Sequence, residues 1–180
     1  IGTVIYVANL VAIAMAREMG CIMTGIIMSG RTGAAFAAQI GSMKINEEID
    51  ALRTFGFSPI DFLVLPRMLA LILMMPLLTV YANLVGMVGG MLVCLGFDIS
   101  MGQYISQSIS ALTLGSVALG IGKSILFGII IAAAGCLRGM QSGSSASAVG
   151  TAATSAVVVS ITAIIITDSL FAVITTLLGI

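Results

Sequence analysis

The stretch MKINEEIDALRTFGFSPIDFLVLPR, residues 43–67, decides how the rest of this chain is interpreted. Seven of the chain's fourteen charged residues fall within residues 44–67, and long apolar segments flank the stretch on both sides. A charged segment between two membrane spans lies outside the hydrocarbon, because charges inside it cost several kcal/mol. The stretch therefore predicts a connection between two spans that is open to soluble partners.

The composition indicates a membrane protein. Of 180 residues, 59% are hydrophobic and 8% are charged, and the mean hydropathy is +1.23. A soluble domain has about 25% charged residues, so this chain cannot cover a water-facing surface. Apolar segments exceed the ~20 residues that a spanning helix needs, and the alternation of a membrane β-barrel is missing. The sequence predicts an all-α polytopic membrane protein with a single transmembrane domain over residues 1–180.

Four apolar blocks are expected, at about residues 1–40, 62–97, 105–137 and 148–180. The first is either one long tilted helix or a span with an apolar leader. The connections after the first and third blocks hold four cations, whereas the connection between the second and third holds only Asp98. The positive-inside rule therefore places residues 43–67 and 138–150 in the cytoplasm and both termini outside. The four cations are Lys44, Arg53, Arg67 and Arg138.

A short helix is expected within residues 43–57, with Asn46 as its N-cap and Gly56 just after its end. Ser58 and Pro59 predict the start of the next helix. Two interpretations remain open: a solvated helix resting on the headgroups, or a coupling helix that docks into a cytoplasmic motor subunit. The short helix has an acidic first turn (Glu47, Glu48, Asp50), a basic end (Arg53) and an apolar face (Ile45, Ile49, Leu52).

Four charged residues fall inside the apolar blocks: Arg17, Glu18, Lys123 and Asp168. Counted at 1.5 Å per residue, all four fit one depth band roughly 18–27 Å from the outer ends. Arg17 and Glu18 point about 100° apart on a helix, so partners from other helices are expected. We predict the pairs Glu18–Lys123 and Arg17–Asp168. They form either a neutralised packing network or the polar lining of a substrate cavity.

Small residues recur at every fourth position in all four blocks. Such faces let helix backbones approach closely in lipid, and they serve packing within the chain or the interface of a homodimer. They are Ser29, Gly33, Ala37 and Gly41; Ser116, Gly120, Ser124, Gly128, Ala132 and Cys136; Ala148, Ala152, Ala156 and Ser160; and Gly86 with Gly90.

Several functions are excluded. A net charge of zero gives no basic surface for nucleic acid, and the chain has no histidine. Cys21, Cys94 and Cys136 lack metal-binding or redox spacing. Residues 120–124, GIGKS, fall short of a phosphate-binding loop, because Val117 stands where that loop needs glycine and no strand precedes it. We therefore expect no catalytic site, no metal and no bound cofactor; any ATP and Mg would belong to a partner.

Short motifs occur in unbroken order over nearly the whole chain. They are REMG (17–20), SGRTG (29–33), IGSMK (40–44), EEIDAL (47–52), GFSP (56–59), LPR (65–67), PLL (76–78), KS (123–124), VG (149–150), AVVVS (156–160) and Asp168. Through them the chain resembles the MlaE-type (YrbE-like) permease subunit of lipid ABC transporters that work with MCE-domain proteins.

The resemblance implies a five-span permease in the bacterial inner membrane, with an interfacial helix and a first span ahead of this region. It implies a homodimer, a cytoplasmic ATPase subunit, a periplasmic MCE-domain ring, phospholipid as cargo and, in some systems, a small cytoplasmic accessory subunit. It assigns ATPase coupling to Glu47, Glu48, Asp50, Leu52 and Arg53, and the lipid cavity to Arg17, Glu18, Lys123 and Asp168.

An ion- or proton-coupled secondary transporter is the alternative. In that case Glu18 and Asp168 would carry protons or cations across the membrane. Internal inverted repeats would favour this class, and none is apparent in the sequence.

Overall fold

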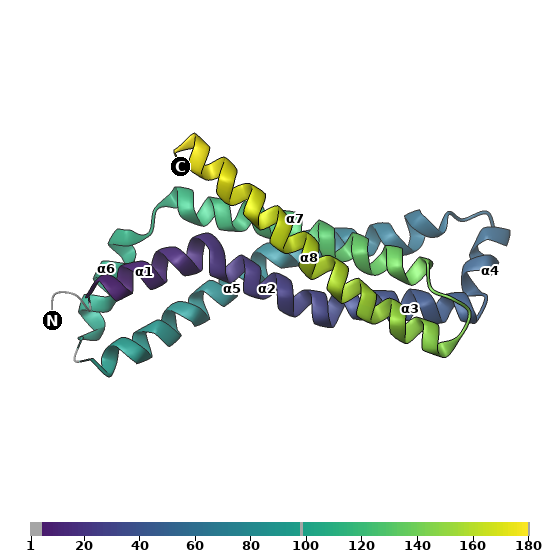
Figure 1. Cartoon of the computed structure of the whole chain (residues 1–180), viewed down its shortest axis with the longest axis horizontal. Coiled ribbons are helices and arrows are strands. Elements are labelled where there is room, and N and C mark those ends of the chain that lie inside the picture. The colour runs from purple at the N-terminus through teal and green to yellow at the C-terminus, as the bar shows by residue number, and fades with distance from the viewer. Residues whose placement is uncertain (1–4, 98, 180) are drawn as a thin grey trace.

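The computed structural model describes residues 5–97 and 99–179. Four helical segments in these ranges are long and apolar enough to cross a membrane: Tyr6–Ile45, Ile60–Leu95, Leu114–Met140 and Ala146–Leu178. They form an elongated bundle, with the short helix α4 (Glu48–Thr54) at one end and α6 (Met101–Ala111) at the other (Figure 1). The predicted all-α polytopic membrane fold is confirmed.

The first span is one continuous helix, which decides between the two possibilities for residues 1–40. It consists of α1 (Ile5–Ala14), α2 (Gly20–Met28) and α3 (Ala34–Ile45). Two π-helical turns join them, η1 (Met15–Met19) and η2 (Ser29–Gly33). A π-turn holds more residues than an α-turn, so it rotates the side chains that follow relative to those that precede it.

The other spans follow the predicted order. The second begins with the π-turn η3 (Ile60–Val64) and continues as α5 (Leu65–Leu95), which contains Pro76 without ending there. The third is α7 (Leu114–Met140) and the fourth is α8 (Ala146–Leu178). A membrane helix tolerates an internal proline because neighbouring groups re-satisfy the freed carbonyl.

The predicted start of the third block, near residue 105, is wrong. Residues there belong to α6, a separate helix opened by a capping box between Ser100 and Gln103. Tyr104 is buried on one side of α6, whereas Ile105 and Ile109 are exposed on another. The apolar residues of this amphipathic helix extended the apparent block toward the N-terminus. Thr113, whose hydroxyl accepts from the Ser116 amide, then starts α7.

The small-residue faces pack inside the bundle, as predicted for intrachain packing. Gly33 and Gly135 meet where α7 crosses the first span: a Cβ on Gly135 would lie 2.7 Å from the Gly33 carbonyl oxygen. Gly139 likewise faces Ala37 and Ile40. Whether such a face also serves a homodimer stays a prediction.

The first and third connections lie at the same end of the bundle, as predicted from their charges. The Lys44 ammonium, at the end of α3, donates to backbone carbonyls at the end of α7. Nearby, the Arg67 guanidinium lies 5.5 Å from the centre of the Phe36 ring and donates to Gln39 at 3.4 Å. Cationic side chains of the first and second spans therefore gather at this end, beside the end of α7.

Candidate functional site: a buried charge cluster and an exposed terminal helix

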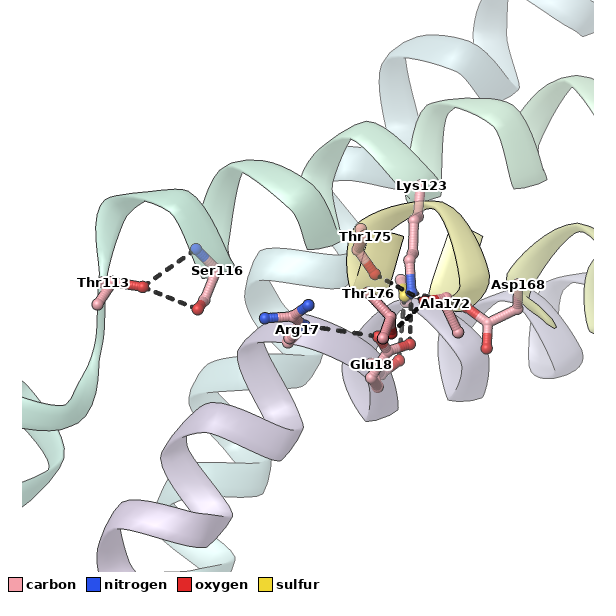
Figure 2. Close-up of polar contacts among 10 residues, drawn as sticks. Arg17, Glu18, Thr113, Ser116, Lys123, Asp168, Ala172, Thr175 and Thr176 are labelled. Atoms are coloured by element: carbon pink, nitrogen blue, oxygen red, sulfur yellow. Dashed lines mark hydrogen bonds and ion pairs between the residues drawn. The ribbon is translucent and has the colours of Figure 1, made fainter. Parts of the chain in front are cut away.

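The central polar feature of the bundle is the ammonium of Lys123. It lies between two carboxylates, donating to Glu18 at 2.5 Å and to Asp168 at 3.0 Å (Figure 2). Lys123 is 1% exposed, whereas the side chains of Glu18 and Asp168 are 32% and 18% exposed. The three residues come from η1, α7 and α8, so the cluster links three of the four spans.

Glycines bring the helices close enough for this contact. Gly120 lies one turn before Lys123, and a Cβ there would overlap the Ala16 carbonyl oxygen in the first span. Gly20, directly after η1, is packed in the same way against the Asn83 side chain of α5. The backbone contact at Gly120 leaves no room for a side chain, and with the contact at Gly20 it lets α7 and α5 enclose the π-turn that carries Arg17 and Glu18.

One predicted charge pair is confirmed and the other is wrong. Glu18 and Lys123 pair as expected, but Asp168 also binds Lys123, and no ion pair joins Asp168 to Arg17 within the described part of the chain. The Arg17 Nε instead lies 3.9 Å from Glu18 Oε1. The π-turn changes the phase of these two residues, which the assumption of a regular α-helix did not include.

The cluster is electrostatically balanced. Arg17 and Lys123 offset Glu18 and Asp168, so the formal charges of the four residues cancel. Burying an unpaired charge in a bundle is costly, and pairing lowers that cost without making the site apolar. Within residues 5–97 and 99–179, no group of three or more His, Cys, Asp or Glu is placed to hold a metal ion.

An apolar groove of about 450 Å³ ends at this cluster. Arg17 and Glu18 lie at one end of its lining, and the rest comes from α1. The groove thus places an apolar surface beside a partly exposed charged pair, a combination that suits an amphipathic ligand. Its remaining lining residues are Tyr6, Asn9, Leu10, Ile13 and Ala14.

The helix expected within residues 43–57 exists but is shorter. It is α4, Glu48–Thr54, and its N-cap is Glu47 rather than the predicted Asn46. Asn46 instead ends α3, and its side chain donates to Glu48 at 3.3 Å. Glu47 has a left-handed backbone with φ of 60°, which turns the chain from α3 into α4. The next helix begins where Ser58 and Pro59 predict, since the Ser58 carbonyl accepts from the Phe62 amide, although η3 shows no side-chain cap bond.

The polar face of α4 is available to a partner. Glu47, Glu48, Asp50 and Arg53 are exposed, and Asp50 pairs with Arg53 at 3.2 Å. Leu52 is different: it packs with Ile49 against the bundle and helps to hold α4 in place. The predicted coupling residues thus divide into an exposed charged face and an apolar base.

A group of exposed aromatic residues lies beside α4 and was not predicted from the sequence. Phe55, Phe57 and Phe62 are 77%, 57% and 58% exposed. Phe57 and Phe62 lie 6.0 Å apart, centre to centre. Three of the chain's seven phenylalanines fall within eight residues around Gly56, and that density could have drawn attention to them.

Comparisons with known proteins agree with this architecture. A family model described as "Permease MlaE" matches residues 1–174. A probable ABC transporter permease protein of Rickettsia typhi is 39% identical over 165 residues, which are 91% of this chain and 64% of that protein. One of Synechocystis is 36% identical over 168 residues, 93% of this chain and 64% of that protein.

A plant relative is also similar. The chloroplastic protein of Arabidopsis thaliana named TRIGALACTOSYLDIACYLGLYCEROL 1 is 36% identical over 163 residues, 90% of this chain and 47% of that protein. The chain thus spans less than two thirds of the length of these relatives.

Proposed function

Because the chain belongs to the MlaE permease family, we propose that it is the membrane subunit of an ABC-type transporter that moves phospholipid or a related lipid. In this proposal a separate ATPase hydrolyses ATP, and this chain converts the resulting motion into lipid movement. The names of the bacterial relatives support the transporter class, and the name of the Arabidopsis relative contains that of a galactolipid.

The observation that carries the lipid proposal is the groove beside the charge cluster. Acyl chains would pack on Leu10, Ile13 and the neighbouring apolar surface of α1. The Arg17 guanidinium, which is 30% exposed, would attract an anionic headgroup at the end of the groove. Lys123 is too deeply buried to meet a headgroup directly, so its role would be to hold Glu18 and Asp168 in position.

The exposed face of α4 is the proposed docking site for the ATPase. Its acidic residues are exposed, while Ile49 anchors the helix to the bundle. The phenylalanines beside it would add apolar contact area, as aromatic residues do at many protein interfaces. By the positive-inside rule this end faces the cytoplasm, where an ATPase would find ATP and Mg.

The proposal extends to the remaining assembly. We propose a homodimer in the bacterial inner membrane, with a periplasmic MCE-domain protein at the α6 end and, in some systems, a small accessory subunit in the cytoplasm. This chain itself would be a non-catalytic subunit.

The alternative, a secondary transporter driven through Glu18 and Asp168, has less support. Both carboxylates bind the same buried ammonium, which competes with protons and cations for them. The relatives are named as ABC permeases, which also favours the first proposal.

Purification of the full-length protein from its native membrane in mild detergent tests the proposal. We expect a stoichiometric ATPase to co-purify, and the reconstituted complex to move fluorescent phospholipid only when ATP is hydrolysed. Lipid movement at an undiminished rate without ATP, or without the ATPase, would refute it.

A further inference from the structure

We propose that Lys44 is a positioning residue that connects α4 to the α7–α8 hairpin, so that a displacement of α4 moves the helices holding Lys123 and Asp168. This inference rests on the proposed function, because it assigns a route by which an ATPase bound at α4 would act on the membrane cluster. It starts from two hydrogen bonds that join segments nearly a hundred residues apart.

The Lys44 ammonium donates to the carbonyl oxygen of Met140 at 2.9 Å and to that of Ser142 at 2.7 Å. Met140 is the last residue of α7, and Ser142 lies in the turn before α8. The final carbonyls of a helix lack partners within it and carry partial negative charge, so a cation binds them favourably. The Lys44 side chain thus satisfies two backbone acceptors of the α7–α8 hairpin.

Lys44 is also rigidly connected to α4. Its carbonyl accepts from the Glu47 amide at 3.2 Å, and the Ser42 carbonyl accepts from the Asn46 amide at 3.0 Å. These bonds close the turn between α3 and α4, where Glu47 adopts its left-handed conformation. A rotation of α4 would therefore act on Lys44 through a short, hydrogen-bonded turn.

Below Lys44 the three helices leave little room for independent movement. A Cβ on Gly41 would lie 3.0 Å from Ser142 Oγ and 3.1 Å from Val149 Cγ2, so α3 touches the loop and the first turn of α8. Between Lys44, Met140 and α4 is a cavity of about 280 Å³, lined also by Ile49, Asp50 and Arg53. The cavity gives α4 space to tilt, whereas the packing below Lys44 transmits the tilt.

Both helices joined by that loop continue to the charge cluster. Lys123 lies 17 residues before Met140 on α7, about 25 Å along the helix, and Asp168 lies 22 residues after Ala146 on α8, about 33 Å. A shift at the loop would change the relative position of these two helices, and with it the contact between Lys123 and Asp168. Lys44 would thus link the docking helix to the cluster without touching either substrate or nucleotide.

The test compares Lys44→Met with Lys44→Arg in the full-length transporter bound to its ATPase. Methionine keeps the apolar stem and removes the donor; arginine keeps a cation that can donate to both carbonyls. We expect Lys44→Met to hydrolyse ATP within about twofold of wild type but to move about tenfold less lipid per ATP, and Lys44→Arg to recover most of this loss. Arg31→Met removes an exposed cation from the same long helix and serves as the matched control, with transport per ATP unchanged.

Hydrogen–deuterium exchange supplies a readout that a merely structural role would not move. In wild type we expect trapping of the ATP-bound state to protect residues 47–55 and to change the exchange of residues 140–148. In Lys44→Met the first effect should persist and the second should disappear. A change at residues 140–148 that equals wild type, or wild-type transport per ATP, would overturn the proposal.

Two further outcomes of the experiment also bear on the proposal. If Lys44→Met fails to assemble, Lys44→Gln undergoes the same comparison; its amide is neutral and shorter by one bond, so it does not reach both carbonyls and the same direction of loss in coupling is expected. If the wild-type complex moves no lipid, the proposed function fails, while the exchange comparison still decides whether Lys44 connects α4 to the hairpin.

Discussion

Lys123 Nζ lies 3.0 Å from Asp168 Oδ1, and the same ammonium also binds Glu18, so one buried cation serves two carboxylates from two other segments. Their placement makes the stability of the bundle depend on the presence of each member. Substitutions in the cluster therefore test these contacts directly.

Removing the buried cation should destabilise the protein. Lys123→Met would leave two carboxylates without their ammonium, at a cost of about 2–4 kcal/mol; this is less than for a fully enclosed pair because Glu18 is 32% exposed. The double variant Lys123→Met/Asp168→Asn should lose less than the sum of the two single losses, since it removes both charges together. Thermal unfolding in detergent measures each variant. Additive losses would show that the two residues do not interact.

Substitution by alanine should have opposite effects on protein stability at two glycines of α7. Gly120→Ala places a methyl group on the Ala16 carbonyl oxygen and should cost about 1–3 kcal/mol by overpacking. Gly122→Ala, two residues away, meets open space and should stabilise the helix by about 0.5–1 kcal/mol. Unfolding temperatures of the two variants make the comparison. A similar response of both would contradict the close approach of α7 and η1.

Neutralising α4 should uncouple the transporter without unfolding it. The triple variant Glu47→Gly/Glu48→Ala/Asp50→Ala removes exposed charges, and glycine suits the left-handed backbone at position 47. The variant loses the exposed Asp50–Arg53 pair, which costs about 0.3–0.5 kcal/mol, and the exposed hydrogen bond from Asn46 to Glu48. We expect a normal unfolding temperature together with weakened ATPase binding in a pull-down. Asp61→Asn, an exposed acidic residue outside α4, is the control; full ATPase binding by the triple variant would remove α4 from the interface.

Cysteine labelling should confirm the orientation. Ser144→Cys at the α4 end and Ser106→Cys at the α6 end are both exposed, whereas the native Cys21, Cys94 and Cys136 are each 1% exposed. In intact spheroplasts a membrane-impermeant maleimide should label position 106, and position 144 only after lysis. Labelling of position 144 from outside would reverse the topology that the positive-inside rule predicts.

The sequence allowed the spans to be placed because length and apolarity determine what can cross a bilayer. It also placed the two cationic connections on one side, which the bond between Lys44 and Met140 confirms. It misplaced the start of the third span, because Ile105 and Ile109 lie on the exposed apolar side of an amphipathic helix. Over a segment as short as α6, the apolar residues of an amphipathic helix resemble the start of a spanning helix.

The site was harder to predict than the fold. The four intramembrane charges were identified by the high cost of charge in lipid, and the pair Glu18–Lys123 was correct. The predicted pairing of Asp168 with Arg17 was wrong, because the direction of the Arg17 side chain depends on the π-turn η1. The sequence of η1, MAREM, does not distinguish a π-turn from an α-turn. The bonds of Lys44 join segments whose proximity arises only in the assembled bundle.

The cation–π contact of Arg67 with Phe36 has a consequence for the depth of the cluster. Arg67 on α5 and Arg138, beside the contact of Gly139 with Ala37, both lie level with residues 36–40 of the first span and would mark the inner edge of the hydrocarbon. About twenty residues of helix, roughly 30 Å, cross that layer. Counted back along the first span from residues 36–40, this length ends near Glu18. On this scale, and with the orientation that the positive-inside rule predicts, Lys123 and its carboxylates would lie closer to the outer edge of the hydrocarbon than to its midplane. The groove along α1 would then open toward the outer surface, where a departing lipid would leave the membrane.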